Sequence, residues 1–138
     1  MKINAKETVK TKAEFNYKTI KTFEDACIKT NVNIPCLQDV SKISDQFKKH
    51  IISAYKLMII YKAINNHWVP DWNNKNQYKY YPSFVIVMRS SSKNILRSYF
   101  RHTCTFIGES EPYLCTDSWE KALYIANQFK NIYEEYLF

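Results

Sequence analysis

One residue type limits most strongly what this chain can fold into: among its 138 residues there is a single glycine, Gly108. Loops that cradle phosphate groups, dinucleotide-binding turns and the sharp turn that carries a catalytic serine all need glycines at fixed positions, because their backbones bend tightly or approach a ligand closely. The sequence therefore excludes these glycine-lined sites. Most classes of nucleotide-dependent enzyme are excluded with them.

The composition predicts one folded domain. Apolar residues make up 46% of the chain and aromatic residues 16%, which is too hydrophobic for an intrinsically disordered protein. A second independent core would be hard to build at half of this length. We therefore expect a basic arm over residues 1–22 and a single domain over residues 23–138. Because polar chain ends fray unless they are tied down, an ordered arm would be docked on its own domain or on a neighbouring subunit.

Targeting signals are missing from the sequence as it stands. No apolar run approaches the roughly 20 residues that a membrane-spanning helix needs. The basic start, Met1 to Lys6, is followed by further charged residues and not by the apolar core of a signal peptide. These features predict a soluble protein of the cytoplasm.

Charge is distributed unevenly along the chain, whose formal net charge is +7. Residues 78–108 hold five basic residues and no acidic ones, whereas residues 109–138 hold six acidic residues and two basic ones. This asymmetry suits a basic face that binds a ligand. It also suits head-to-tail packing of identical subunits, with the acidic end of one copy on the basic face of the next.

Helix signals occur in three places. Thr22, followed by Glu24 and Asp25, predicts the start of a short helix that ends before residue 31. Apolar residues at three-to-four spacing predict the best helix of the chain from Ser44 to about residues 65–66; they are Phe47, Ile51, Tyr55, Met58 and Ala63. Asp117 with Glu120 matches a capping box and predicts that a final helix runs from there toward the chain end.

Strand signals lie between the second and third helices, after a turn-rich loop over residues 67–77. Alternating apolar residues predict strands over residues 83–89, 95–107 and 113–115, which together would form an antiparallel meander. The predicted fold class is therefore α+β: a small antiparallel sheet of about three strands packed against two main helices, with a short N-terminal helix.

A catalytic or metal site is not evident from the sequence. The three histidines lie far apart, and the spacings of the four cysteines do not match the short pairs of zinc sites. We expect Cys27, Cys36, Cys104 and Cys115 to be reduced and mostly buried. The prediction is a protein that is not an enzyme and has no cofactor, no metal and no evident small-molecule substrate.

The more suggestive pattern is a basic and aromatic face on the predicted middle strand. Arg97, Tyr99 and Arg101 alternate, so they would share one face of a sheet. With Lys79 and Arg89 they would offer cations for phosphates and a ring for base stacking on a single-stranded nucleic acid. Two other interpretations fit equally: the ordinary solvent-exposed face of a half-buried sheet, and a protein–protein interface, where tyrosine and arginine are both enriched.

A second concentration of aromatic side chains surrounds the loop over residues 67–77. It comprises Trp68, Trp72, Tyr78, Tyr80 and Tyr81. We expect this aromatic cluster to close one end of the core, with an exposed binding patch as the alternative.

These residues also carry a resemblance. The runs Trp68-Val69-Pro70-Asp71-Trp72 and Tyr78 to Phe84, then Leu114-Cys115 and the segment from Glu120 to Phe129, resemble a group of small, uncharacterised proteins encoded by bacteriophages and prophages of gut Bacteroidetes. The segment Phe23 to Cys27 fits the same pattern, whereas residues 90–107 depart from the glycine- and aromatic-rich sheet that the group implies.

The resemblance implies a setting and no particular activity. Small non-enzymatic phage proteins are commonly virion components or accessories that handle nucleic acid. We therefore expect a homo-oligomeric structural component of the phage head or head–tail region, located in the virion or the host cytoplasm. Its expected partners are copies of itself and other phage structural proteins, and we expect no membrane as a partner. The alternative is an accessory protein that binds nucleic acid.

Overall fold

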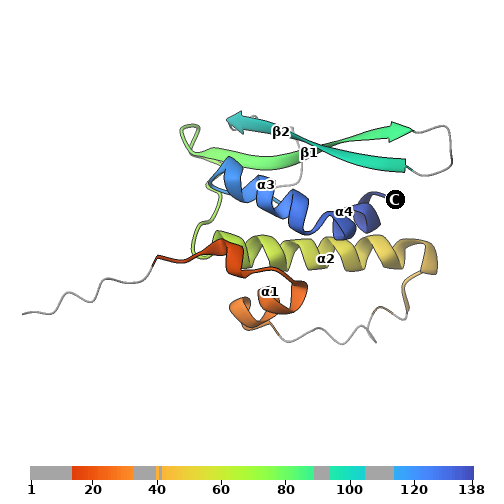
Figure 1. Cartoon of the computed structure of the whole chain (residues 1–138). Helices are drawn as coiled ribbons and strands as arrows, with labels where there is room; N and C mark the ends of the chain where they lie inside the picture. The colour runs from red at the N-terminus through yellow and green to blue at the C-terminus, as the bar shows by residue number, and fades with distance from the viewer. Residues whose placement is uncertain (1–13, 33–39, 41, 89–93, 105–113) are drawn as a thin grey trace, which may run out of the picture.

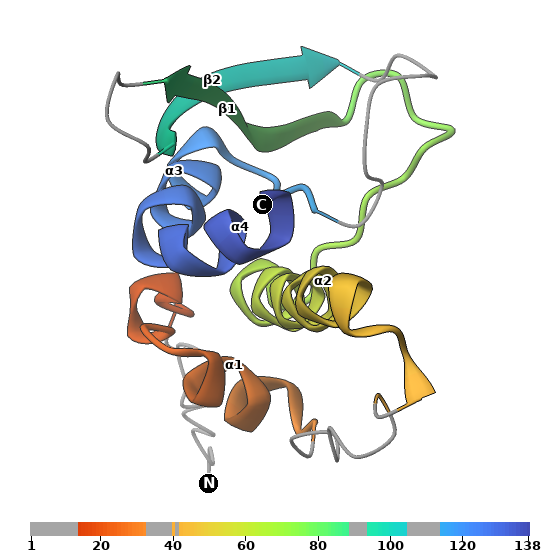
Figure 2. The same cartoon turned by 90° about the vertical axis from the view of Figure 1, so that its right-hand side faces the viewer.

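The computed structural model describes residues 14–32, 40, 42–88, 94–104 and 114–138, and at residues 85–88 and 94–104 it describes the backbone. The elements follow in the order η1 (Tyr17–Thr19), α1 (Phe23–Thr30), α2 (Asp45–Asn65), β1 (Tyr78–Met88), β2 (Asn94–Cys104), α3 (Trp119–Gln128) and α4 (Lys130–Leu137). They stack in layers: the strand pair covers α3 and α4, these lie on α2, and α1 lies on the opposite side of α2 (Figures 1 and 2).

The predicted fold class is wrong, because the described residues are mostly helical and carry no three-stranded sheet. β1 and β2 form a two-stranded antiparallel sheet. In place of the predicted third strand there is an isolated bridge between Thr116 and Tyr80, whose two backbone bonds measure 2.8 and 2.9 Å. The bridge ends at once because Ser118, two residues on, already caps α3.

The register of the strand pair defines its two faces. Phe84 pairs with Ser98, and its ring lies 4.5 Å from the ring of Tyr133 in α4. Successive residues along a strand lie on opposite faces. The face that includes Phe84 is therefore turned to the helices, and the face that includes positions 83 and 85 is turned away from them.

The start of α1 confirms the predicted cap. The Thr22 hydroxyl oxygen accepts from the Asp25 backbone N–H at 3.1 Å, and the Asp25 carboxylate accepts from the Thr22 backbone N–H at 2.9 Å. This reciprocal pair satisfies two donors that a helix start otherwise leaves unbonded. The helix ends at Thr30, which confirms the predicted end before residue 31, and the next residue, Asn31, is in the left-handed conformation.

The core lies between α2 and the two C-terminal helices. Leu57, Ile60 and Ile64 of α2 are buried against Ile125, Phe129 and Tyr133. The hydroxyls of Tyr61 and Tyr133 are hydrogen-bonded at 2.6 Å inside this layer. The predicted bounds of α2 are confirmed, but the side chains that it buries are on a different face from Phe47, Ile51 and Met58.

The C-terminal helix differs from the prediction in two ways. It begins one residue later, because the Ser118 hydroxyl, and not the Asp117 carboxylate, accepts from the backbone N–H three residues on. Asp117 forms an ion pair with Lys121 at 2.8 Å instead. The helix is also interrupted at Phe129, a buried residue with φ −113° and ψ 27°, so that α3 and α4 are separate.

The described part of the predicted arm, residues 14–22, packs on α3. Ile20 is buried, and its carbonyl oxygen accepts from the Tyr124 hydroxyl at 2.9 Å. The Gln128 side-chain amide donates to the Lys21 carbonyl at 2.9 Å, and the rings of Tyr17 and Tyr124 meet edge to face. Residues 1–13 lie outside the described residues.

None of the helices that the structure describes is both long enough and apolar enough to cross a bilayer.

Candidate interaction surface

The predicted basic and aromatic face is described only at the level of the backbone. Arg97, Tyr99 and Arg101 pair with Val85, Ser83 and Tyr81, so these positions share the face of the strand pair that is turned away from the helices. Arg89, the fourth member of the predicted site, lies outside the described residues.

Lys79 does not belong to an exposed basic surface. Lys79 is only 2% exposed, and its ammonium group donates to the Gln77 carbonyl oxygen at 2.8 Å. The ammonium nitrogen also lies 5.2 Å from the ring centre of Trp72. We expected Lys79 to be a cation available to phosphates, but the loop between α2 and β1 folds back and covers it. Lys79 therefore holds this loop to β1 and is not placed to bind phosphate.

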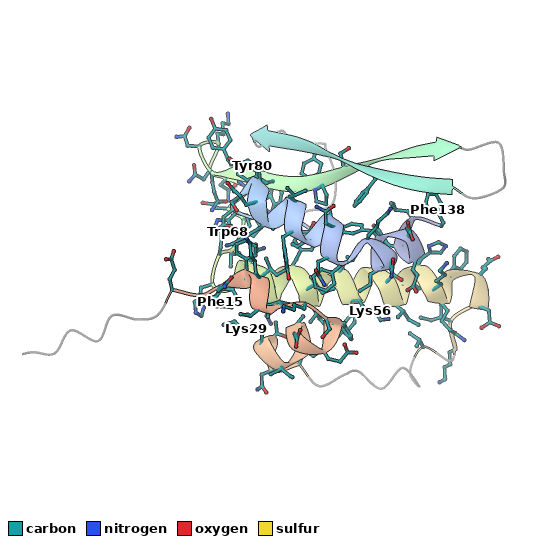
Figure 3. All side chains as sticks on the ribbon, viewed as in Figure 1. Phe15, Lys29, Lys56, Trp68, Tyr80 and Phe138 are labelled. Carbon is teal, nitrogen blue, oxygen red and sulfur yellow. The ribbon has the colours of Figure 1, made fainter. Side chains whose placement is uncertain are left out.

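The aromatic cluster is divided between different surroundings. Tyr78 and Tyr80 stack with ring centres 6.5 Å apart, while Trp72 covers Lys79. Trp68 lies at the C-terminal end of α2, beside Met58 and Lys62 (Figure 3). Tyr80 and Tyr81 are half-buried, whereas Trp72 and Tyr78 are exposed. The cluster therefore closes one end of the core only in part.

The described cysteines have the environment of structural thiols. Cys27 and Cys115 are buried thiols. Burial raises the pKa of the Cys115 thiol to about 11, against the opposing effect of the nearby Lys79 cation, and burial also raises the pKa of Cys27. Both are therefore protonated at neutral pH. Cys36 lies outside the described residues, and of Cys104 only the backbone is described.

The most distinctive surface lies along α2, where large apolar side chains face outward. Phe47 is 55% exposed, Ile51 42%, Tyr55 39% and Met58 46%. With the half-buried Ala54, these residues occupy a continuous arc of about 100° around the helix at 3.6 residues per turn. We call Phe47, Ile51, Ala54, Tyr55 and Met58 the α2 stripe.

The stripe leads into a hollow at the C-terminal end of α2. This hollow has a volume of about 540 Å³ and is lined by Met58, Lys62, Asn65, Asn66, His67, Trp68, Val69 and Pro70. The chain turns here through Asn66, which has a positive φ of 57°. The turn places Trp68, Val69 and Pro70 beside Met58, so an apolar concavity adjoins the exposed stripe.

The end of α4 lies beside the other half of α2. His50 Nδ1 and the Tyr136 carbonyl oxygen are 2.9 Å apart, and the Glu135 carboxylate accepts from the buried Ser53 hydroxyl at 3.3 Å. The next two residues, Leu137 and Phe138, are exposed. Figure 3 shows Phe138 above the N-terminal half of α2.

The charges of α2 are mostly positive, with four lysines and one aspartate. Lys48 pairs with Asp45 at 2.7 Å, and Lys56 lies over the ring of Phe23 in α1, 5.8 Å from its centre. Lys62 is exposed and borders both the stripe and the hollow. The single acidic residue of the helix is thus at its start, where it is paired with Lys48, and the cation nearest the hollow is at its end.

Other chemistry is limited in what the structure describes. Within residues 14–32, 40, 42–88, 94–104 and 114–138 no group of three or more histidine, cysteine, aspartate or glutamate side chains is arranged to hold a metal ion. The spacing of the α2 stripe was visible in the sequence as a helix signal, but its exposure was not. The chain matches no protein-family model, no curated protein and no solved structure.

Proposed function

We propose that the chain is a non-enzymatic phage protein, a homo-oligomeric component of the head or head–tail region that acts by binding copies of itself and other particle proteins. One observation carries the proposal: the α2 stripe leaves four large apolar side chains exposed side by side along a stable helix. Single exposed apolar residues are ordinary on protein surfaces, but a contiguous group is typical of an interaction site.

The size of the stripe supports a protein contact. With about 150–250 Å² for a whole aromatic side chain and somewhat less for an aliphatic one, the exposed fractions give about 350 Å² of apolar surface. Covering this area on two copies would contribute roughly 17 kcal/mol at about 25 cal/mol per Å². Association costs about 4–15 kcal/mol in lost freedom of motion, besides the ordering of side chains at the contact. The stripe therefore supplies a large part of what association needs, and the exposed Leu137 and Phe138 add to it.

The phage setting comes from the resemblance of residues 68–72, residues 78–84 and the C-terminal segment to small phage and prophage proteins. In that setting a chain with an exposed apolar stripe is suited to a particle built from repeated contacts. The charge asymmetry of the sequence agrees with packing between copies.

Two measurements test this proposal. Size-exclusion chromatography with light scattering on the purified chain should give a mass of at least two copies, and mass spectrometry of purified phage particles should detect the chain. A chain that stays monomeric at high concentration and is missing from particles would contradict the proposal.

An accessory role in binding nucleic acid is the second candidate, favoured by the shared face of positions 97, 99 and 101 on β2. Fluorescence anisotropy with a labelled single strand at low salt tests it. Because phosphate contacts release counterions, affinity should fall steeply as salt rises. The double variant R97A/R101A should bind more weakly, whereas K42A, which removes an exposed cation elsewhere, should change little. No binding at low salt would remove this candidate.

A further inference from the structure

From the α2 stripe we infer that two copies of the chain pair through this surface about a two-fold axis, with their α2 helices antiparallel. This inference rests on the proposed function, because it names the surface and the geometry of the self-contact. Four observations carry it: the spacing of the stripe, the position of the hollow, the distribution of charge along α2 and the area available.

The spacing of the stripe is that of a helix-pairing seam. Phe47, Ile51, Ala54 and Met58 are separated by four, three and four residues. This alternation is the heptad pattern whose side chains fit between those of a second helix. The seam ends after Met58, because the next position in the pattern, Tyr61, is turned into the chain's own core and is buried.

Antiparallel pairing makes this seam complementary to itself. When two such helices run in opposite directions, Phe47 of one copy faces Met58 of the other, and Ile51 faces Ala54. The large Ile51 side chain thus meets the small Ala54, so the helix axes can approach closely at the centre. Residues that contact each other reciprocally in this way are the mark of a two-fold interface.

The hollow lies where this arrangement needs space. Met58 forms part of its lining, together with Trp68, Val69 and Pro70. Phe47 of the second copy arrives at Met58, so its ring, which is 55% exposed in one chain, would enter the hollow at its edge. A volume of about 540 Å³ is ample for one aromatic ring. Aromatic side chains anchored in pockets of this kind dominate the energy of many interfaces.

Charge favours the antiparallel order over the parallel one. Asp45 stands at the start of α2 and Lys62 near its end. Antiparallel order brings the Lys62 end of one helix beside the Asp45 end of the other, and it also opposes the two helix dipoles. Parallel order would place Lys62 beside its own copy.

The available area reaches the range of a real interface when neighbouring residues are included. The stripe alone gives about 700 Å² over two copies, and stable interfaces bury about 1,200–2,000 Å² in total. Leu137 and Phe138 lie beside the N-terminal half of α2 and are exposed, while Val69 is exposed at the hollow. These residues extend the contact at both ends of the seam.

Cysteine cross-linking tests the geometry directly. Under mild oxidation, A54C should give a disulfide-linked dimer, since the two copies of residue 54 lie near the axis. F47C alone should not, because antiparallel order separates its two copies by 11 residues along the helix, or about 16 Å. A mixture of F47C and M58C chains should cross-link to each other. The wild-type chain, treated in the same way, measures the background from its own four cysteines.

A matched pair of charge substitutions tests the surface. I51K places a cation at the centre of the seam and should shift the mass of the wild-type dimer to that of a monomer. I28K makes the same change at an even more exposed residue of α1, 80% exposed and away from the stripe, and should leave the dimer intact. Circular dichroism on both variants checks that each remains folded.

The outcomes separate this inference from the proposed function. Cross-linking of A54C together with loss of the dimer in I51K supports both. A chain that oligomerises but shows no A54C cross-link, or keeps its oligomer in I51K, overturns the antiparallel α2 pairing and leaves the proposed function in place. A wild-type chain that is monomeric at every concentration overturns the pairing, and it overturns the proposed function as well when the chain is also missing from phage particles. Cross-linking of F47C alone points to parallel order and also overturns the inference.

Discussion

Two adjacent residues of α2 give the sharpest prediction about stability. Leu57 is fully buried, with 0% exposure, whereas Met58, the next residue, is 46% exposed on the stripe. Both are large apolar residues, and Met58 belongs to the apolar spacing that predicts the helix, whereas Leu57 does not. Replacing each by alanine therefore distinguishes the face that packs against α3 and α4 from the face that is open.

The expected magnitudes differ several-fold. L57A removes buried methyl groups and leaves a cavity, which costs about 3 kcal/mol of unfolding free energy within the usual range of about 2–5. M58A removes atoms that are already half in water and leaves no cavity, so it should cost about 0.5–1 kcal/mol. For a chain of this size, the first change should lower Tm by about 10 °C and the second by only a few degrees.

Urea and thermal unfolding followed by circular dichroism measure both effects. The experiment is done at low micromolar concentration, because self-association would add a concentration-dependent stabilisation that M58A would also remove. An M58A variant that is destabilised as strongly as L57A would refute the assignment of the two faces of α2.

Three further predictions follow from individual contacts. The Lys21 and Thr22 backbone N–H groups hold the pKa of Asp25 below its usual value near 3.8, so the stability that this carboxylate contributes is present above that pH and is lost as pH falls through the lower folded value. D25N should therefore flatten the acid limb of the stability profile between about pH 5 and about pH 2 in urea titrations. An unchanged limb would contradict this. The Cys115 thiol is buried and its pKa is about 11, so it should react with iodoacetamide only on unfolding, as measured by peptide mass spectrometry. Alkylation of the native chain at the rate of an exposed thiol would be the contrary result. Y124F removes the hydroxyl that donates to the Ile20 carbonyl, so it should lower the free energy of unfolding by about 1 kcal/mol in urea and increase proteolysis near residues 14–22. Equal stability and equal cleavage would mean that this contact does not hold the segment.

Local signals in the sequence were sufficient to predict the boundaries of α1 and α2. Thr22 and Asp25 are three residues apart and satisfy each other's backbone donors, so the start of α1 depends on nothing distant. The two strands that pair as β1 and β2 were also visible as alternating segments on either side of a turn-rich stretch. The interruption at Phe129 was not predictable, because no proline or glycine marks it.

Which face of α2 is buried could not be read from the sequence. The helix carries apolar residues on two sides, with Leu57, Ile60 and Ile64 on one and Phe47, Ile51 and Met58 on the other. Periodicity detects either stripe, but only the positions of α3 and α4 decide which one is covered. The candidate surface was thus present in the sequence as a heptad spacing, and its exposure became visible only in the fold.

Lys79 and the third strand differ from the predictions for two separate reasons. The sequence gives the charge of Lys79 but does not show which segment covers its side chain. Trp72, seven residues earlier, lies over the Lys79 ammonium and removes it from the surface. Residues 114 and 115 of the predicted third strand form no ladder, and only Thr116 bridges to Tyr80 before Ser118 caps α3.

Methionine oxidation tests most directly whether the outward face of α2 is covered by a second copy. The rate at which dilute peroxide oxidises Met58 is measured by peptide mass spectrometry from low micromolar to near-millimolar protein, with free methionine in the same solution as the reference. The rate should fall as concentration rises, because pairing buries the half-exposed side chain. A rate for Met58 that stays constant relative to free methionine over the whole range would contradict the pairing.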